Sequence, residues 1–424
     1  MSNSRLERWV APVNHQRPVQ EAACDILEVH AVVLINYLRP HHVVALQELA
    51  KRIRKLSVLV SVPMEADRDW HPEWADLDVT IQKNYTICRQ WNHSSGFSEN
   101  NFIHVPADTI SQLKRLQPDI IFSYEMGFRT LLSCWYRVFN RNTRLVMVGN
   151  MSDHIEAERG ISRRCLRWII KKGVDFFTYN GPACRRYLES LKIPAQKMFH
   201  IPYCIDPQVV STREKSTPHE DVKHLLYCGA LSSRKGMVPF VSELNKWCRH
   251  NTGKSVVLTI AGSGPSESEL RSLRTDNLEI RFLGNCSTNQ IKACFHLADF
   301  CVYPTLADEW GLVPIEAMAS GVPILGSKYA QSVETHVVPN VNGWQFDPLK
   351  SESIFNAIDD ALHISEADWI GKSKASRDSV ANISAATTAE KFCNLIRQTV
   401  SEESDCVKPS MNHQSSDIPT QYFN

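Results

Sequence analysis

The chain has 424 residues, of which 43% are hydrophobic, and its formal net charge at pH 7 is +1. This length predicts two or three domains with sizeable apolar cores, and the balanced charge gives no reason to expect nucleic acid binding. The sequence has no run of eighteen apolar residues and no apolar signal-peptide core, so we expect a cytoplasmic protein without a membrane span. Thirteen scattered cysteines without a C-x-x-C pair favour buried thiols over disulfides or a zinc site.

Strand-like and helix-like segments alternate from residue 31 onward. A continuous apolar run at 31–37 is typical of a strand buried on both faces. Apolar residues at helical spacing then predict a helix over 41–56. Further strands are predicted at 57–62, 77–81, 119–124, 144–149 and 175–179, with helices at 106–116, 127–139 and 181–190. Such alternation predicts a parallel sheet covered by helices on both faces.

A polar, proline-containing stretch at 197–224 interrupts this alternation, which restarts at 224–230. We therefore predict an α/β fold with two doubly wound, Rossmann-like domains facing across a cleft. Ligands of such sheets bind beyond the carboxyl ends of the strands. The predicted segments are an N-terminal domain over 28–205, a C-terminal domain over 206–385, a last helix over 386–400 and a disordered polar tail over 401–424.

The most informative stretch is 307–327, ADEWGLVPIEAMASGVPILGS, which follows an apolar strand-like run. Pro314 and Gly321 mark the start and the end of a helix. A helix N-terminus offers free N–H groups and partial positive charge to an anion. Glu316, about one turn into the helix, can accept hydrogen bonds from ligand hydroxyls, while Asp308 stays on the preceding loop. The arrangement suits a nucleotide sugar.

This stretch resembles the donor-site signature of glycosyltransferase family 4, whose members are retaining enzymes of the GT-B fold. The family pattern has two glutamates eight residues apart; Glu316 matches the second, and Asp308 replaces the first. Further matching positions are Trp310, Gly311, Ala317, Met318, Gly321 and Pro323. The resemblance covers about 224–400 and implies that the last helix packs back on the first domain.

A second matching motif, LLYCGALSSRKG at 225–236, resembles the family's phosphate loop. Lys235 stands at the family's lysine, but Ala230 stands at its arginine, and we predict that Arg234 compensates. TIAGSGPSESEL at 259–270 also resembles the donor domain. The donor-binding residues that we predict are Gly229, Arg234, Lys235, Gly264, Glu309, Gly311, Leu312 and Glu316.

The resemblance implies a catalytic set of Asp308, Glu316, Lys235 and His154. Lys235 would neutralise the leaving diphosphate, and Glu316 would bind the ribose hydroxyls through charge-assisted hydrogen bonds. Asp308 would contact the donor sugar or stabilise positive charge at its anomeric carbon, with Glu309 as the adjacent alternative. His154, on a loop after a predicted strand of the N-terminal domain, would lie near the donor sugar.

The N-terminal domain is expected to hold a saccharide, lipid-linked or small-molecule acceptor. His41 and His42 follow its first strand, at the place where the family has a glycine-rich loop that this chain lacks. GISRRCLRWIIKKG at 160–173 is basic and amphipathic, so it can lie on an anionic membrane surface. A domain helix with one buried stripe and one solvated face fits the same residues, so peripheral contact with the inner face of the membrane stays one of two alternatives.

We therefore predict a retaining glycosyltransferase that uses a nucleotide diphosphate-sugar donor and needs no metal or other cofactor. Two D-x-D triplets, at 67–69 and 76–78, lie apart from the donor motifs. One alternative is a nucleotide-sugar epimerase or glycan phosphorylase of the same architecture. Another is a non-catalytic binding or scaffold protein, because Asp308 and Ala230 depart from the family pattern.

Overall fold

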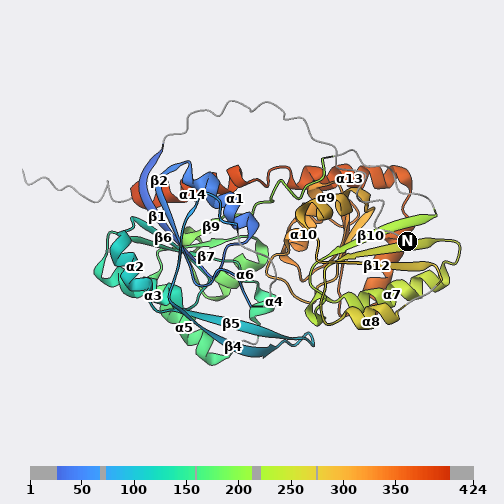
Figure 1. Ribbon diagram of the computed structural model, residues 1–424, viewed down its shortest axis with the longest axis horizontal. Coiled ribbons are helices and arrows are strands. Elements are labelled where there is room, and N and C mark those ends of the chain that lie inside the picture. Colours follow the sequence, from blue (N-terminus) through green and yellow to red (C-terminus); the bar gives the residue numbers. More distant parts are fainter. Residues whose placement is uncertain (1–25, 67–72, 158–159, 213–220, 274–275, 402–424) are drawn as a thin grey trace, which may run out of the picture.

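The computed structural model of the chain describes residues 26–66, 73–157, 160–212, 221–273 and 276–401. Two lobes lie side by side, each built around a parallel sheet with helices on its faces (Figure 1). The predicted α/β fold with two doubly wound parallel sheets is confirmed. No helix among these residues combines the length and the apolar character needed to cross a membrane.

The first sheet has seven parallel strands in the order β3-β2-β1-β6-β7-β8-β9. Its strands are β1 (Leu27–Ile35), β2 (Ile53–Val60), β3 (Asp78–Ile81), β6 (Ile120–Tyr124), β7 (Arg144–Val148), β8 (Phe176–Tyr179) and β9 (Met198–His200). The helices of this lobe are α1 (Pro40–Ala50), α2 (Thr109–Leu116), α3 (Phe128–Phe139), α4 (Asp153–Glu156), α5 (Ile161–Gly173) and α6 (Pro182–Ser190).

The apolar side chains of β1 contribute to the hydrophobic core on both faces of its sheet. Val33 and Ile35 belong to one buried cluster, and Val32 and Leu34 belong to a second. Successive side chains of a strand point to opposite faces, so a continuous apolar run supplies both layers of the core at once.

Two predicted boundaries are wrong. The helix predicted over 41–56 ends at Ala50, and β2 begins at Ile53, which pairs with Leu27 of β1. A short apolar run is compatible with a helix or a strand, and Ile53–Val60 forms a strand because it pairs with β1. The interruption predicted over 197–224 is also shorter, because β9 and the start of β10 lie inside it.

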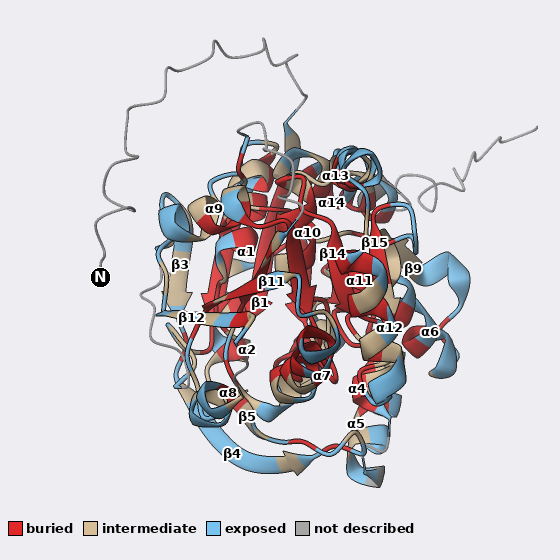
Figure 2. Ribbon diagram, turned by 90° about the vertical axis from the view of Figure 1, so that its right-hand side faces the viewer, coloured by how far each residue is buried: buried red, intermediate tan, exposed pale blue. Residues whose placement is uncertain are grey.

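A two-stranded antiparallel hairpin, β4 (Asn84–Asn92) with β5 (Ser98–Pro106), was not predicted. It runs along the lower edge of the first lobe, and its turn extends toward the second lobe (Figure 1). Most of β4 is exposed (Figure 2). Tyr85, Ile87 and Trp91 alternate with polar residues along β4, and this pattern is the signal from which the strand could have been predicted.

The second sheet has six parallel strands in the order β12-β11-β10-β13-β14-β15. Its strands are β10 (Val222–Cys228), β11 (Ser255–Ala261), β12 (Leu278–Gly284), β13 (Phe300–Tyr303), β14 (Ile324–Ser327) and β15 (Gly343–Phe346). The helices are α7 (Met237–His250), α8 (Glu267–Ser272), α9 (Thr288–Leu297), α10 (Leu312–Ala319), α11 (Gln331–His336), α12 (Ser351–Leu362) and α13 (Glu366–Val380). The strand order reverses between β10 and β13, the switch point at which such sheets bind ligands.

The last helix, α14 (Ala385–Ser401), leaves the second lobe and lies along the first (Figure 1). Ala389, Phe392 and Leu395 are buried in the same cluster as β1 and α1. The chain therefore crosses between the lobes twice, once before β10 and once before α14. From residue 402 onward, the tail predicted over 401–424 lies outside the described residues.

Candidate functional site

The loops after β10 and after β13 pack tightly at the switch point of the second sheet. The first loop contains a 3-10 turn, Ser233–Lys235, followed by Gly236 at φ +65°. A Cβ atom on Gly236 would lie 2.1 Å from the carbonyl oxygen of Pro304 in the second loop. Only glycine permits this approach, which brings the cations of the first loop next to the second.

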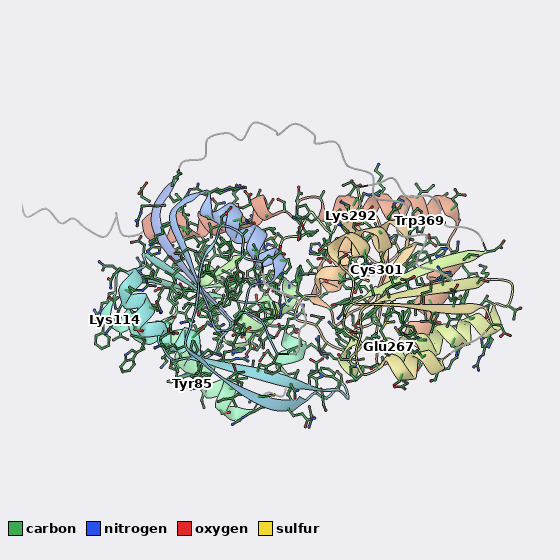
Figure 3. The ribbon with its side chains drawn as sticks, viewed as in Figure 1. Tyr85, Lys114, Glu267, Lys292, Cys301 and Trp369 are labelled. Carbon is green, nitrogen blue, oxygen red and sulfur yellow. The ribbon has the colours of Figure 1, made fainter. Side chains whose placement is uncertain are left out.

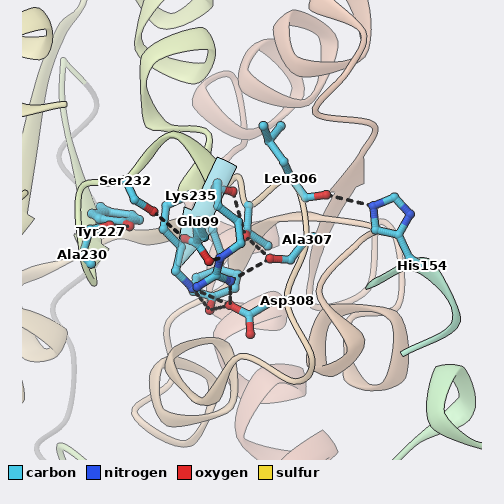
Figure 4. A network of polar contacts seen from close by, with 12 residues as sticks. Glu99, His154, Tyr227, Ala230, Ser232, Lys235, Leu306, Ala307 and Asp308 are labelled. Carbon is cyan, nitrogen blue, oxygen red and sulfur yellow. Dashed lines mark hydrogen bonds and ion pairs between the residues drawn. The ribbon is translucent and has the colours of Figure 1, made fainter. Parts of the chain in front are cut away.

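Asp308 is the centre of a polar network in these two loops (Figure 4). Its Oδ2 atom lies 2.5 Å from Lys235 Nζ and 3.5 Å from Arg234 Nη1, and the Tyr303 hydroxyl donates to it at 2.7 Å. Arg234 Nη1 also donates to the carbonyl oxygen of Ala307 at 2.8 Å. The predicted cations and the predicted carboxylate therefore contact each other directly.

The charges of this network shift the pKa values of Asp308 and Lys235. Burial alone would raise the pKa of Asp308, but Lys235 and then Arg234 outweigh burial and hold the pKa well below its usual range. Burial, and then the charge of Arg234, lower the pKa of Lys235 despite its contact with Asp308. Two cations thus share the largely buried carboxylate of Asp308.

Glu99 of β5 reaches this network from the first lobe. Its Oε2 atom accepts a hydrogen bond from Arg234 Nε at 2.7 Å, and its Oε1 atom accepts one from Ser232 Oγ at 3.1 Å. Sequence reasoning missed Glu99, because its partner Arg234 lies 135 residues away and β5 was not predicted. The hairpin therefore links the first lobe to the loop after β10.

Glu316 lies one turn into α10, at the same edge of the sheet. Leu312 begins this helix directly after Gly311, whose φ is +84°. The Glu316 carboxyl group is half-buried, and no hydrogen bond from the described residues reaches it. Burial, and then the charge of Asp206, raise the pKa of Glu316 to about 7. Its charge also acts on the Cys228 thiol at the end of β10, so this unpaired carboxyl group stands near the start of the cation-bearing loop.

Glu309 faces the first lobe. Burial, and then the charge of Glu125 in the first lobe, raise its pKa to about 7, although Arg39 opposes the shift. The carbonyl oxygen of Glu309 accepts from Gln331 Nε2 at 2.6 Å, and Gln331 Oε1 accepts from the Cys184 backbone N–H at 2.8 Å. The loop after β13 is thereby tied to the first lobe at Glu309.

His154 makes a further connection between the lobes. Its Nε2 atom lies 3.0 Å from the carbonyl oxygen of Leu306, two residues before Asp308, and its ring stacks on Tyr329 with centroids 4.0 Å apart. Burial is the main cause that lowers the pKa of His154, which favours the neutral ring. This predicted residue therefore lies beside the loop that carries Asp308 (Figure 4).

The glycines after β11 serve close packing of loops. A Cβ atom on Gly264 would lie 2.7 Å from the carbonyl oxygen of Leu231, and one on Gly262 would lie 1.9 Å from that of Gly229. Gly229 itself has φ +144°. These contacts join the loop after β11 to the loop after β10, and a donor-binding role of Gly229 and Gly264 stays a prediction.

His41 and His42 do not join the network around Asp308. Both rings are buried in the first lobe and line a small cavity of about 20 Å³ together with Tyr124. The first D-x-D triplet, 67–69, lies outside the described residues, and Asp78 of the second lies in β3, an edge strand of the first sheet.

A pocket of about 590 Å³ opens between the lobes. It is lined by α4 and α6 of the first lobe and by residues 328–334 and Gln345 of the second. His154 belongs to its lining, whereas Lys235 and Asp308 do not. The stacked rings of His154 and Tyr329 therefore stand between this pocket and the network around Asp308.

Comparison with known proteins finds that the second lobe is similar to glycosyltransferases. Residues 210–375 match the family model described as Glycosyl transferases group 1. An uncharacterised glycosyltransferase of Methanocaldococcus jannaschii, MJ1607, is 28% identical over 45% of this chain and 47% of its own length. The lipopolysaccharide 1,2-N-acetylglucosaminetransferase of Salmonella typhimurium is 27% identical over 38% of this chain and 44% of its own length. The chain thus spans about half the length of these relatives.

Solved structures extend the likeness to both lobes. Anabaena Alr3699/HepE in complex with UDP has a TM-score of 0.65, with 16% identity, over 87% of this chain and 100% of its own. Sucrose-phosphate synthase from Thermosynechococcus elongatus has a TM-score of 0.62, with 17% identity, over 88% of this chain and 100% of its own. The chain has the GT-B fold. The family match covers the second lobe, and the likeness in fold covers both lobes.

Proposed function

We propose that the chain is a retaining glycosyltransferase of family 4 that moves a sugar from a nucleotide diphosphate-sugar to a saccharide, lipid-linked or small-molecule acceptor. The observation that carries this proposal is the pair of buried cations, Arg234 and Lys235, at the switch point of the second sheet. The match of residues 210–375 and the UDP in the structure of Anabaena Alr3699/HepE support it. An enzyme with such acceptors would act in polysaccharide or glycoconjugate biosynthesis.

In this proposal the two cations stabilise the leaving diphosphate. A charge pair at about 4 Å is worth roughly 4 kcal/mol at an effective dielectric constant near 20, before desolvation. The interaction accelerates the reaction only to the extent that it strengthens as negative charge develops on the leaving group. Asp308 positions Lys235, and Glu99 positions Arg234, at the edge of the sheet where the diphosphate would leave.

The carboxyl groups would act on the sugar side of the donor. Glu316, free of protein partners among the described residues, would accept hydrogen bonds from the ribose hydroxyls. Asp308 or the neighbouring Glu309 would support positive charge at the anomeric carbon, with His154 beside the same loop. No residue is assigned as a covalent nucleophile, and attack from the face of the leaving phosphate would retain the anomeric configuration.

Calorimetric titration with UDP tests the donor site. We expect Lys235→Ala to weaken UDP binding about 10- to 100-fold, because a charge-assisted hydrogen bond contributes roughly 1.5–3 kcal/mol. Lys374→Ala, which removes an exposed lysine of α13, is the matched control and should bind UDP normally. The double variant Lys235→Met, Asp308→Asn removes both partners of this ion pair, so it leaves no unpaired charge and tests UDP binding even if a single substitution disturbs folding. Equal UDP affinity in this variant and in the wild type would remove Lys235 from the donor site.

Acceptor dependence separates transfer from the alternatives. Incubation with UDP-glucose as a probe donor should release UDP only when a sugar acceptor is added, and Glu316→Gln should reduce that release. An epimerase would convert the donor without releasing UDP, a phosphorylase would require inorganic phosphate, and a scaffold protein would bind without turnover. Any of these three results would contradict the proposal, as would unchanged turnover in Glu316→Gln.

A further inference from the structure

The exposed aromatic side chains are confined to one side of the first lobe. Among the described residues, the large aromatic side chains that are exposed are Tyr85 (70%), Phe128 (39%), Trp135 (62%), Phe139 (74%) and Trp168 (54%). All five belong to β4, α3 and α5, and the second lobe has none within its described part. Tyr85 projects from the lower edge of the first lobe (Figure 3). A distribution confined to one face distinguishes this surface from scattered apolar exposure.

Helix α3 has an unusual distribution of apolar side chains. One face is buried in the first lobe and consists of Arg129, Thr130, Ser133 and Tyr136. Phe128, Trp135 and Phe139 recur every seven and four residues, so they form a stripe along the other face, and Val138 adjoins it with 60% exposure. A surface helix of a globular protein ordinarily presents polar residues there. The outer stripe of α3 therefore lacks a partner among the described residues.

Helix α5 lies beside α3 and continues the apolar surface. The Cys134 thiol of α3 donates to the carbonyl oxygen of Ile170 at 3.8 Å, and Arg137 Nη1 donates to that of Gly173 at 3.0 Å. Trp168 and Ile169 point outward from α5, with 54% and 50% of their surfaces exposed. The two helices thus present one continuous surface, and β4 borders it at the lower edge of the lobe (Figures 1 and 2).

The two helices of this surface contribute cations and no carboxylates, although Asp175 pairs with Arg137 and Glu156 pairs with Arg163 and Arg167. Neither α3, FRTLLSCWYRVF, nor α5, ISRRCLRWIIKKG, contains an acidic residue. Arg164 and Lys172 are exposed on α5, and Arg141 is exposed just after α3. Lys172 Nζ lies 3.5 Å from the centroid of the Trp168 ring, so cation and aromatic ring share one site. Two such surfaces would repel each other, whereas an anionic surface would attract either of them.

We propose that α3, α5 and β4 form a docking surface for an anionic phospholipid bilayer. Aromatic rings favour the boundary between headgroups and acyl chains, and lysine and arginine bind anionic headgroups. Each cation near such a surface strengthens binding roughly five-fold. This inference does not depend on the proposed enzymatic activity.

Docking would also orient the cleft. The carboxylate of Glu156 in α4 forms ion pairs with Arg163 and Arg167 of α5, and Arg167 is buried. The same short helix α4 carries His154, which contacts the loop after β13. A bilayer bound at α5 therefore lies against the element that borders the cleft, where an acceptor with a lipid anchor would enter.

Vesicle sedimentation of the full chain tests this proposal. We expect the protein to sediment with vesicles of phosphatidylcholine and phosphatidylglycerol but not with phosphatidylcholine alone, and to be released at high salt. Phe139→Ser with Trp168→Ser should weaken binding at least ten-fold, and Arg164→Glu with Lys172→Glu should do the same. All four side chains are outside the proposed donor site, so UDP affinity should stay unchanged in both variants.

Matched controls come from the second lobe, where Leu297 and Ile370 are exposed at 67% and 50%. Leu297→Ser with Ile370→Ser should leave vesicle binding at the wild-type level. Absent sedimentation, equal binding to neutral vesicles, or unchanged binding of both surface variants would overturn the proposal. So would analytical ultracentrifugation showing a dimer that Phe139→Ser with Trp168→Ser dissociates, because the surface would then belong to a second copy of the chain.

Discussion

Asp308→Asn removes the only negative charge that Lys235 contacts in the network at the switch point. In the wild type, Asp308 Oδ2 accepts hydrogen bonds from Lys235 and from the Tyr303 hydroxyl, and its charge also balances Arg234. After the substitution, Arg234 keeps its ion pair with Glu99, but Lys235 keeps only neutral acceptors, which are the Tyr303 hydroxyl at 3.3 Å and the new amide oxygen. The variant therefore contains a buried ammonium group without a counter-charge.

The size of the effect follows from burial. Removing one partner of a buried ion pair typically costs about 3–5 kcal/mol, and the remaining Arg234–Glu99 pair puts this case near the lower end. For a lobe of this size, each kcal/mol lowers the midpoint of thermal unfolding by roughly 2–4 °C, so about 3 kcal/mol corresponds to roughly 6–12 °C. Differential scanning calorimetry is the suitable assay, because it can resolve separate transitions of two lobes.

Glu279→Gln is the matched control in the same lobe. It breaks the ion pair with Arg281, whose partners are 2.7 Å apart but about half exposed. Exposed pairs contribute about 0–1 kcal/mol, so the midpoint should fall by less than roughly 4 °C. If Asp308→Asn lowered the midpoint no more than Glu279→Gln does, the reasoning from a buried charge network would be refuted.

The pH dependence has a definite sign. The folded-state pKa of Asp308 is held well below its usual value, so its charged form stabilises the fold above about pH 4 and this contribution is lost in more acidic solution. The difference in unfolding free energy between wild type and Asp308→Asn should therefore be constant at neutral pH and shrink below about pH 4.

Three further predictions concern other carboxyl groups. Burial raises the pKa of Glu316 to about 7, so this carboxyl group should lower stability by about 1–2 kcal/mol, allowing for partial exposure, as the pH rises from about 4.5 to 7. In calorimetric scans, stability should therefore fall less in Glu316→Gln than in the wild type, and Glu309, whose pKa is also about 7, should account for part of the remaining slope. Glu156→Gln leaves Arg167 buried without its partner, and the free energy of unfolding of the first lobe should fall by about 3–5 kcal/mol in urea titrations. Glu99→Ala frees Arg234 from the hairpin, so amide hydrogen exchange at the turn between β4 and β5 should accelerate.

Each of these predictions has a control among exposed residues. Glu269→Gln should keep the wild-type pH slope, Glu189→Gln should cost less than about 1 kcal/mol because its pair with Arg185 is half exposed, and Asn100→Ala should leave exchange at the hairpin turn unchanged. An equal pH slope in Glu316→Gln and wild type, equal effects of Glu156→Gln and Glu189→Gln, or equal exchange in Glu99→Ala and wild type would contradict the respective prediction.

Much of the fold was predictable because buried parallel strands have a strong local signal. The apolar runs at 31–37 and 224–230 must each fill two core layers, so they identify central strands without knowledge of their partners. The positions of Lys235 and Asp308 after such strands also predict a shared edge of one sheet. Local pattern failed where pairing decides the structure, as at Ile53, where a predicted helix is a strand.

The links between the lobes could not be predicted from the sequence. Glu99 and Arg234 are 135 residues apart, and His154 and Leu306 are 152 residues apart. No periodicity in the sequence connects such pairs. The motif predicted that Asp308 lies on the loop before the helix. It did not predict that the carboxylate contacts Lys235, because this contact depends on the close packing of Gly236 against Pro304.

The same contacts couple the donor site to the arrangement of the lobes. Arg234 is held by Glu99 of the first lobe as well as by Asp308 of its own, so any anion that draws Arg234 toward itself competes with the link between the lobes. By thermodynamic reciprocity, weakening that link must change the affinity for such an anion by the same factor. A diphosphate that binds Lys235 alone would leave the hairpin in place, whereas one that binds both cations would release it. Hydrogen exchange at the hairpin turn in the presence of UDP therefore distinguishes the two modes of binding.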